Sequence, residues 1–565
     1  MARGAMAVIA LPPRPPALPQ AQLVLGLAAF AVVALVTVAP VVVVVLGAIS
    51  GDVWRETLAS PLSRSAIGYS LLLALRAPVA ALVGFLIAWL VIRIRIPGGR
   101  YIEFAMWISF FVPLLPVTLS WILLLDPHYG LVNQALMALP FIHAPLFNIY
   151  SIEGIFWVHI TASSVPVMVV LLGPAIRQFD ASFEEIARVC GARPFAVFRN
   201  VTLPILAPAI LTGALAGFIK SLEAFEVEQL LGRPSGIFVY STRIYDLAAW
   251  EPPKFQDAMA LSSIVLVILL IIALLYQRVS RRFDYATVLA RGARYEPLSI
   301  GRARWLVAGA LWLVVAISLV IPLTMLVVGS CMKLFGFFSI AAPYTLDHWY
   351  EVLDNPLFQS ALQNSLVMSF AAGFCGTAAY AVIAYLIARS RLPGRGVIDL
   401  LAWLPWTIPG ILLGVSVLYL ILSSPILSFL YGSIASLVLI IAVAQLPIGT
   451  HMMKTSIRQI AIELEQSSRV CGAGPARTFV RIVLPLIRPM LVSIFILVFI
   501  SAMRDISTII FLASAGSQTL SLLMIQFGMS SNLEAGAVIG VITTAIIVAV
   551  ALVGRRFGLA LTEQR

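Results

Sequence analysis

The sequence contains few charged residues for a chain of its length. Only 11% of the 565 residues are Asp, Glu, Lys or Arg, whereas 61% are hydrophobic, and the mean hydropathy is +1.02. A soluble protein of this length needs far more charge to cover its surface. The composition therefore excludes a soluble globular chain and predicts a polytopic membrane protein.

Residues that commonly bind metals or form disulfides are also scarce. Five histidines are widely spaced, and four cysteines show no CxxC spacing, so neither a zinc site nor a disulfide framework is indicated. The cysteines lie in or beside apolar segments, at Cys190, Cys331, Cys375 and Cys471. We therefore predict no metal site and no cofactor held by this chain.

Lysine is equally rare, and its positions exclude one class of function. A Walker A loop needs a Gly-Lys pair before Ser or Thr, but none of the four lysines follows a glycine. The sequence also lacks the clusters of acidic or histidine residues that an integral-membrane enzyme would need. We therefore predict no catalytic residues and no nucleotide-hydrolysing site in this chain.

Long apolar runs make up most of the sequence. About 20 residues of helix cross the roughly 30 Å of hydrocarbon in a bilayer, and lipid cannot satisfy exposed backbone groups. The runs therefore predict an all-α fold with about twelve transmembrane helices. In the first half they lie near residues 21–49, 67–92, 102–125, 152–176, 205–225 and 258–277. In the second half they lie near 305–332, 364–388, 397–423, 432–453, 487–513 and 535–554.

The basic residues set the expected orientation. The net charge of +12 does not indicate a nucleic-acid partner, because Lys and Arg occur in short clusters between apolar runs. No Lys or Arg occurs between Arg100 and Arg177 or between Arg395 and Lys454, and each gap contains one predicted outside loop. The positive-inside rule then predicts a multi-pass membrane protein with both termini in the cytoplasm.

One polar loop occurs twice. Residues 184–204 (EEIARVCGARPFAVFRNVTLP) match residues 465–485 (EQSSRVCGAGPARTFVRIVLP), and each residue of the first copy has its counterpart 281 positions later. The stretch 86–100 likewise resembles 382–396, with Trp107 and Trp403 at a constant offset of 296. Each half has an even number of predicted spans, so we predict two parallel six-helix repeats, residues 1–290 and 291–565.

The repeated loop has the features of a rigid turn. Glu185 and Arg188 are spaced to pair on one helical face, and Gly191 and its counterpart Gly472 are suited to the left-handed conformation that ends a helix. A proline then opens the next helix, and Pro208 and Pro489 are expected to kink it, as prolines inside helices do. Force applied to such a loop would tilt the membrane helix that follows.

The pattern E-x-A-R-x-x-G followed by Leu-Pro, present twice, resembles the cytoplasmic EAA loop of permeases in type I binding-protein-dependent ABC importers. The resemblance covers nearly the whole chain. It implies a multi-pass protein of the bacterial inner membrane, in which each loop is a coupling helix seated on an ATP-hydrolysing partner. The residues that carry it are Glu185, Ala187, Arg188, Gly191 and Pro204 in the first half, and Gln466, Ser468, Arg469, Gly472 and Pro485 in the second. The second copy departs from the pattern, because Gln466 stands at the glutamate position and Ser467 and Ser468 follow it.

The same resemblance implies the partners. We expect two copies of an ABC-type ATPase subunit, which would bind and hydrolyse the ATP, together with a periplasmic or lipid-anchored substrate-binding protein. The alternative interpretation of each loop is an amphipathic helix at the membrane surface, without a partner.

Ionisable residues at the ends of two equivalent spans are candidates for the translocation path, because such groups are costly in a membrane. They are Glu223, Glu226, Arg504 and Asp505, with Lys220 nearby. The alternative interpretation is that these are ordinary helix ends with side chains that reach the membrane surface.

The substrate is inferred from resemblance alone. Fused two-half permeases of this length resemble the ferric-iron importer branch, so Fe(III) is the expected substrate, with thiamine, phosphonate or polyamine as alternatives. A carboxylate such as Glu223 or Glu226 is compatible with the preference of Fe(III) for hard oxygen donors. An ion-coupled secondary transporter is the alternative from another class, but it has no use for two matched loops.

Overall fold

The computed structural model describes residues 20–47, 52–282, 300–390, 394–530 and 532–556. The described residues form helices and the connections between them. Met332 and Tyr344 pair in an isolated antiparallel bridge. Eight of the described helices are long and apolar enough to cross a membrane, or up to twelve if each of four bent pairs is one span. The predicted all-α polytopic class is confirmed. The predicted boundary at residues 290–291 lies outside the described residues.

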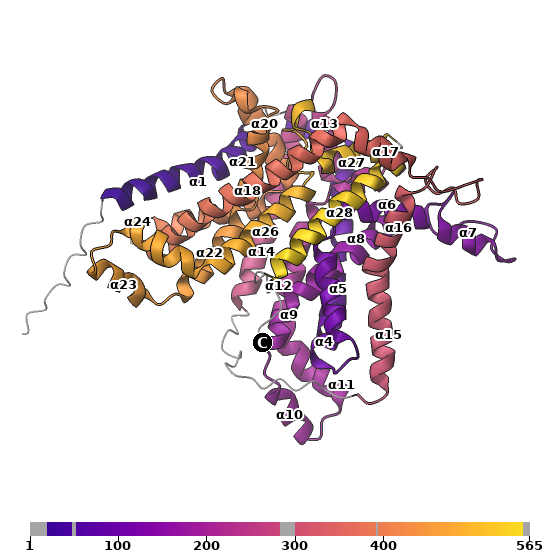
Figure 1. Ribbon diagram of the computed structural model, residues 1–565, viewed down its shortest axis with the longest axis horizontal. Helices are drawn as coiled ribbons and strands as arrows, with labels where there is room; N and C mark the ends of the chain where they lie inside the picture. The colour runs from indigo at the N-terminus through magenta and orange to yellow at the C-terminus, as the bar shows by residue number, and fades with distance from the viewer. Residues whose placement is uncertain (1–19, 48–51, 283–299, 391–393, 531, 557–565) are drawn as a thin grey trace, which may run out of the picture.

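Each half repeats one order of helices (Figure 1). The first half contains α1 (Gln20–Gly47), α2 (Val53–Ala59), α3 (Pro61–Ala74), α4 (Arg76–Arg93), α5 (Gly99–Phe111), α6 (Leu114–Leu125), α7 (Leu131–Met137), α8 (Ile152–His159), α9 (Val165–Gln178), α10 (Ser182–Val189), α11 (Pro194–Val197), α12 (Leu203–Leu222), α13 (Tyr240–Ala248) and α14 (Phe255–Arg282). The second contains α15 (Ala303–Val315), α16 (Ile321–Ser330), α17 (Asp347–Asp354), α18 (Pro356–Arg389), α19 (Arg395–Trp403), α20 (Gly410–Ser423), α21 (Ile434–Ala444), α22 (Leu446–Gln459), α23 (Ile462–Val470), α24 (Pro475–Thr478), α25 (Leu484–Leu486), α26 (Arg488–Arg504), α27 (Leu520–Met529) and α28 (Leu533–Arg556).

Two of the four bends are shared by the halves. The chain turns by 103° between α5 and α6. In the second half it turns by 108° between the stretch Arg395–Thr407, which contains α19, and helix α20. Pro113 and Pro409 lie at these turns, and each lacks the N–H that a continuous helix would need. The predicted spans 102–125 and 397–423 are therefore each two short helices that meet at a sharp angle.

The other two bends belong to the second half alone. The chain turns by 54° between α21 and α22 and by 76° between α25 and α26. The first-half counterparts, Ile152–Gln178 and Pro194–Leu222, are unbroken. The kink expected at Pro489 is therefore matched by a bend two residues earlier, at Ile487. At Pro208 the helix α12 continues without a break.

The predicted span 487–513 is too long. Helix α26 ends at Arg504, and residues 505–513 form turns. Asp505 accounts for this end, because its carboxylate accepts hydrogen bonds from the Thr508 amide at 3.0 Å and the Thr508 hydroxyl at 2.9 Å. Such a local bond competes with the continuation of the helix.

Each half is built around a central trio of helices. In the first half α4 packs against α9 and α12, and in the second α18 packs against α22 and α26. At one close contact between the central helices, the large and the small residue exchange places between the halves. A Cβ on Gly84 would lie 2.5 Å from Met168 Cβ, whereas at the equivalent positions a Cβ on Gly449 would lie 2.1 Å from the Tyr380 ring.

The first helix of each half also packs against the other half. Helix α1 contacts α14 of its own half and α19 and α20 of the second half. Helix α16 contacts α28 of its own half and α6 of the first half, and α15 contacts α5. The two repeats are therefore joined by reciprocal helix exchange.

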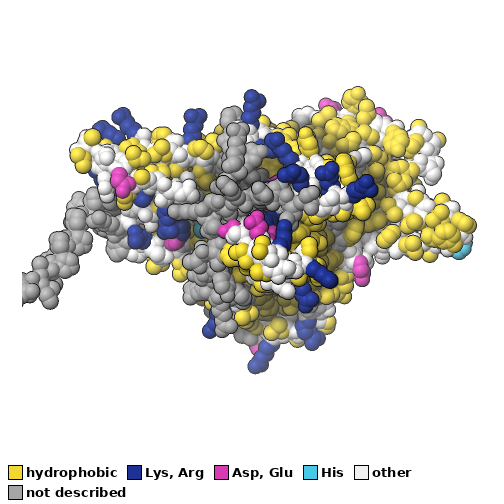
Figure 2. Space-filling view, turned by 90° about the horizontal axis from the view of Figure 1, so that it is seen from below, with side chains coloured by type: hydrophobic (Ala, Val, Ile, Leu, Met, Phe, Trp, Pro, Cys, Tyr) yellow, Lys and Arg dark blue, Asp and Glu magenta, His cyan; other side chains and the backbone are white. Residues whose placement is uncertain are grey.

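The two halves form arms that diverge toward the repeated loops. In Figure 1, α10 lies at the bottom of one arm and α23 at the left end of the other, whereas α13, α20 and α27 lie together at the top. Figure 2 views the molecule from the α10 side, where Lys and Arg side chains are scattered around the loop and hydrophobic side chains cover the flank at the right. The basic surface is thus on the side where the sequence predicts the cytoplasm.

Candidate functional site

The first repeated loop, residues 184–204, is a helix, a glycine turn and a second helical stretch. Helix α10 ends before Gly191, which has φ +84 and so adopts the expected left-handed conformation. The outer face of the loop is apolar: Ile186 is 61% exposed, Val189 88% and Phe195 73%. Glu185 is also exposed. This face is available to a partner.

The second loop, residues 465–485, has the same backbone and a more polar face. Gly472 has φ +81, and Val470 is 89% exposed. Ser467 and Ala476 stand where the first loop has Ile186 and Phe195. The turn is therefore retained, whereas the apolar surface around it is smaller.

A buried ion pair anchors the first loop to the membrane helices. Glu184 Oε2 lies 2.5 Å from Arg93 Nη2 at the end of α4, and both side chains are buried. The Thr202 hydroxyl donates a 2.7 Å hydrogen bond to Glu184 Oε1. Arg188 lies 3.6 Å from Glu184, so the expected pairing of Arg188 with Glu185 is wrong. Glu184 faces inward as the anchor, and Glu185 faces outward.

The second loop has the equivalent anchor. Glu465 Oε1 lies 2.8 Å from Arg389 Nε, again at the end of the corresponding helix. The Tyr385 hydroxyl donates to Glu465 Oε2 at 3.1 Å, and Arg389 donates to the carbonyls of Ile457 and Ile460. Sequence reasoning missed both anchors, although a glutamate at the same loop position in both copies was a usable signal.

The second helical stretch of each loop carries a proline that interrupts the regular hydrogen bonding. The π-helical turns η2 (Phe198–Thr202) and η8 (Phe479–Val483) directly precede Pro204 and Pro485, which have no amide to donate. Phe198 packs edge-on against Trp89, with the ring centroids 4.7 Å apart. The first loop is thus packed against α4, and in each half a π-helical turn leads from the loop toward the next span.

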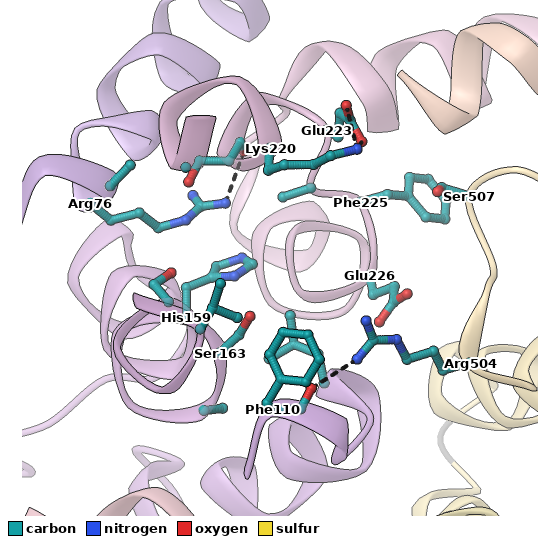
Figure 3. Close-up of a pocket in the computed structure, with 18 of the residues that line it drawn as sticks. Arg76, Phe110, His159, Ser163, Lys220, Glu223, Phe225, Glu226, Arg504 and Ser507 are labelled. Atoms are coloured by element: carbon teal, nitrogen blue, oxygen red, sulfur yellow. Dashed lines mark hydrogen bonds and ion pairs between the residues drawn. The ribbon is translucent and has the colours of Figure 1, made fainter. Parts of the chain in front are cut away.

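A polar cavity of about 340 Å³ lies between the halves. It is lined by the four residues predicted for the translocation path, Glu223, Glu226, Arg504 and Asp505, and also by Lys220. Lys220 Nζ lies 2.9 Å from Glu223 Oε2, and in Figure 3 Arg504 points toward Glu226. The structure therefore brings together charges that the sequence places in two equivalent segments.

Three buried charged or titratable side chains beside the cavity were not predicted. Arg76 lies 3.7 Å from Glu228, and His159 Nε2 lies 2.9 Å from the same Glu228 oxygen. Arg76 also donates to the Ser221 carbonyl at 2.9 Å, which ties α4 to the end of α12. Arg76 and His159 fall inside predicted apolar spans, and that position was the signal that could have revealed them.

Two further ion pairs lie nearer the loops. Glu103 pairs with Arg177, and Asp399 pairs with Lys454 at 2.7 Å. Glu103 and Asp399 occupy equivalent positions, so both halves join the short helix before the first bend to the span that leads into the loop. No group of three His, Cys, Asp or Glu side chains among the described residues converges on a possible metal site.

Two parallel helical repeats, each with an anchored polar loop at one end and a shared polar cavity between them, define a membrane transport protein built by duplication. The sequence agrees with one family in both repeats. The model of the binding-protein-dependent transport system inner membrane component matches residues 80–285 and 380–562. The chain belongs to this family.

Similar proteins with curated descriptions include the ferric transport system permease protein FbpB of Actinobacillus pleuropneumoniae, which is 26% identical over 66% of this chain and 53% of its own length. A putative ferric transport system permease protein, FbpB 1 of Haemophilus influenzae, is also 26% identical, over 66% of this chain and 58% of its own length. The chain thus spans little more than half the length of these two relatives. The trehalose transport system permease protein SugB of Mycobacterium tuberculosis is 31% identical over 40% of this chain and 82% of its own length.

Among solved structures, a bacterial alginate ABC transporter in complex with an alginate pentasaccharide-bound periplasmic protein contains a similar chain. It is 20% identical, with a TM-score of 0.41, over 46% of this chain and 95% of that chain.

Proposed function

We propose that this chain is the permease subunit of an ATP-driven, binding-protein-dependent importer, and that its substrate is Fe(III). The observation that carries the proposal is the pair of anchored loops. Two loops of one backbone shape are each fixed by a buried glutamate to the end of a central helix, α4 in the first half and α18 in the second, and each is followed in the chain by the next span of its half. A transporter driven by ions would not need such loops.

The exposed faces of the loops support two copies of an ABC-type ATPase as partners. Ile186 and Val189 on the first loop and Val470 on the second are apolar side chains at the tips of polar loops, and such side chains commonly form the centre of an interface. The ATPase would bind the ATP, and this chain would bind no cofactor. A periplasmic or lipid-anchored binding protein would dock on the opposite side, with both termini of this chain in the cytoplasm.

The mechanism proposed is alternating access. ATP binding would draw the two ATPase subunits together and, through the loops, bring the diverging arms of Figure 1 closer. ATP can shift this balance only through contacts that differ between the two states, and the loops supply such contacts. Glu185, Ala187, Arg188 and Gly191 would transmit the force in the first half, and Gln466, Ser468, Arg469 and Gly472 in the second. Pro204 and Pro485 would pass it to the next span.

Fe(III) as substrate is supported by the descriptions of the two ferric transport relatives. The cavity between the halves offers the carboxylates of Glu223, Glu226 and Asp505, which are hard oxygen donors. These are accompanied by cations, so the path would pass the ion without holding it tightly, and the binding protein would provide selectivity. Thiamine, phosphonate and polyamines are the alternative substrates of the same class.

The test is uptake by cells that lack the chromosomal copy and carry either the natural chain or the double variant Gly191→Val, Gly472→Val. Valine disfavours a positive φ, and a Cβ at either position meets nothing within 4 Å, so the change acts on the turn alone. We expect uptake of ⁵⁵Fe(III) to fall at least tenfold in the double variant. Gly68→Val with Gly309→Val is the matched control, because both are helical glycines in open space without a positive φ.

Three other outcomes would each reject a different part of the proposal. Uptake of labelled thiamine, phosphonate or polyamine in place of iron would reject the substrate and retain the class. Uptake that survives ATP depletion and follows an ion gradient would reject the class in favour of a secondary transporter. Undiminished, nucleotide-dependent uptake by the double valine variant would reject the role of the loops.

A further inference from the structure

Two cations reach across the boundary between the halves, one from each half. Lys220, in the last turn of α12, places its Nζ 4.7 Å from the centre of the Trp406 ring. Arg504, the last residue of α26, donates a 3.2 Å hydrogen bond from Nη1 to the carbonyl of Phe110. Figure 3 shows the hydrogen bond between Arg504 and Phe110 at one side of the cavity and Lys220 at the opposite side.

The two receiving residues are equivalent in the duplication. Trp406 follows Phe110 by 296 positions, the same offset that relates Trp403 to Trp107. The two cations come from the matching ends of α12 and α26, although Arg504 is equivalent to Glu223 and not to Lys220. The contacts are therefore a reciprocal pair. In each half the helix after the loop supplies one cation. This cation contacts the sharp bend of the opposite half: Lys220 of the first half contacts Trp406, and Arg504 of the second half contacts Phe110.

The bends explain why cations are placed there. Phe110 is one of the last residues of α5, and the final carbonyls of a helix have no partner within it. These carbonyls also form the negative end of the helix dipole, which attracts a cation. Trp406 lies in the 3₁₀ turn η6 (Leu404–Thr407) at the other bend, where its ring face receives Lys220.

The contacts lie far from the coupling loops. Helix α12 has 20 residues, which corresponds to about 30 Å of rise from the loop to Lys220. The arms diverge toward the loops and meet at the opposite end. The two contacts therefore join the halves where the path would open to the outside.

We infer that Lys220 and Arg504 are positioning residues that hold the cavity closed at the end remote from the coupling loops, through reciprocal contacts with Trp406 and Phe110. The inference rests on the proposed function. Substrate passes from the docked binding protein into the cavity only after both contacts break.

Neighbouring carboxylates make the contacts reversible. Lys220 keeps its ion pair with Glu223 of the same helix when it leaves Trp406. Arg504 keeps the attraction of Glu226 and Asp505 when it leaves Phe110. Opening therefore leaves neither cation unpaired in a region where an unpaired charge is costly.

The test uses the complex of the full chain with its ATPase subunits, reconstituted in lipid nanodiscs, with and without the binding protein. Lys220→Gln and Trp406→Leu each remove one contact, and Arg504→Gln removes the other. We expect ATP hydrolysis without the binding protein to rise by roughly fivefold, the factor for loss of one weak contact, and further in the variant that lacks both contacts. Trp406→Phe keeps a ring and should stay near the natural rate.

Arg304→Ala is the matched control, because it removes a cation–ring contact with Trp305 on α15, away from the cavity. Hydrolysis without binding protein that matches the Arg304→Ala rate in all three variants, in complexes with unchanged thermal midpoints, would overturn the inference. If a glutamine variant does not assemble, Trp406→Leu decides by the same comparison, since it removes the ring that Lys220 contacts and leaves every charged side chain in place. A natural complex with no nucleotide-dependent uptake would instead reject the proposed function.

Discussion

The two halves differ most beside the cavity. The first half buries Arg76, His159 and Glu228 there, whereas the equivalent positions of the second half are Ala372, Ile440 and Ile509, all buried. The loops, in contrast, keep the same turn and the same buried anchor in both halves. Duplication has therefore preserved the parts that would receive force and has let the chemistry of the path diverge. Mutations that exchange features between the halves test this difference.

The largest expected effect is on the anchors that the halves share. Arg93→Ala leaves Glu184 buried without its nearest cation, and Arg389→Ala does the same to Glu465. Breaking a buried pair by removing one partner costs about 3–5 kcal/mol. We expect the thermal midpoint of each purified variant to fall and the ATPase subunit to be lost. A variant that kept both would show that the anchor is dispensable in that half.

A somewhat smaller effect is expected from the group that the halves do not share. Glu228→Ile alone leaves Arg76 and His159 beside an apolar side chain and should destabilise by about 3 kcal/mol. The triple variant Arg76→Ala, His159→Ile, Glu228→Ile copies the second half and should recover most of that loss, because a fully apolar replacement is often neutral. Thermal midpoints compare the two. A triple variant less stable than the single one would contradict the prediction, and recovered stability with lost uptake would place the group in the path.

The exchanged packing of the cores predicts a change of about 2 kcal/mol. Gly449→Ala puts a Cβ 2.1 Å from the Tyr380 ring, and overpacking of this kind costs about 1–3 kcal/mol. The double variant Tyr380→Gly, Gly449→Met reproduces the arrangement of Gly84 and Met168 and should be more stable than Gly449→Ala. Gly68→Ala is the control, since a Cβ there meets nothing within 4 Å. Equal midpoints for Gly449→Ala and Gly68→Ala would disprove the close packing.

The smallest effect on stability is expected on the outer faces of the loops. Ile186→Ser and Ser467→Ile exchange an exposed residue between the loops, and such changes alter the free energy of unfolding by less than about 0.5 kcal/mol. The expected difference is in partner retention: Ile186→Ser should lose ATPase during purification, and Ser467→Ile should retain more. Identical retention would show that the apolar face of the first loop makes no contact with the partner.

The sequence predicted the class and the duplication because these depend on composition and on a repeat of constant offset. The left-handed Gly191 and Gly472 were also predicted correctly, since a glycine after a short helix is a local signal. The partner of Arg188 was assigned wrongly. Two adjacent glutamates gave no local indication of which one faces the membrane helices, and only the position of Arg93 decides that.

The cavity was predicted in part. Glu223, Glu226, Arg504 and Asp505 were found because they interrupt equivalent spans. Arg76 and His159 were missed because each is a single residue within a long apolar run, and their common partner Glu228 is far from both in the sequence. The bend at Gln445 also escaped prediction, because a proline occurs near the corresponding position in both halves, at Pro166 and Pro447, and only the second half bends there.

The exchange of α1 and α15–α16 between the halves determines which parts can move together. The first helices of each repeat, α1 in one and α15–α16 in the other, belong covalently to that repeat but pack against the bent helices of the other repeat. If the arms rotate as proposed, α1 must move with α19 and α20 or slide along them, and α16 must do the same with respect to α6. The helices therefore pack as two mixed bundles, and the border between these bundles does not coincide with the border between the two repeats.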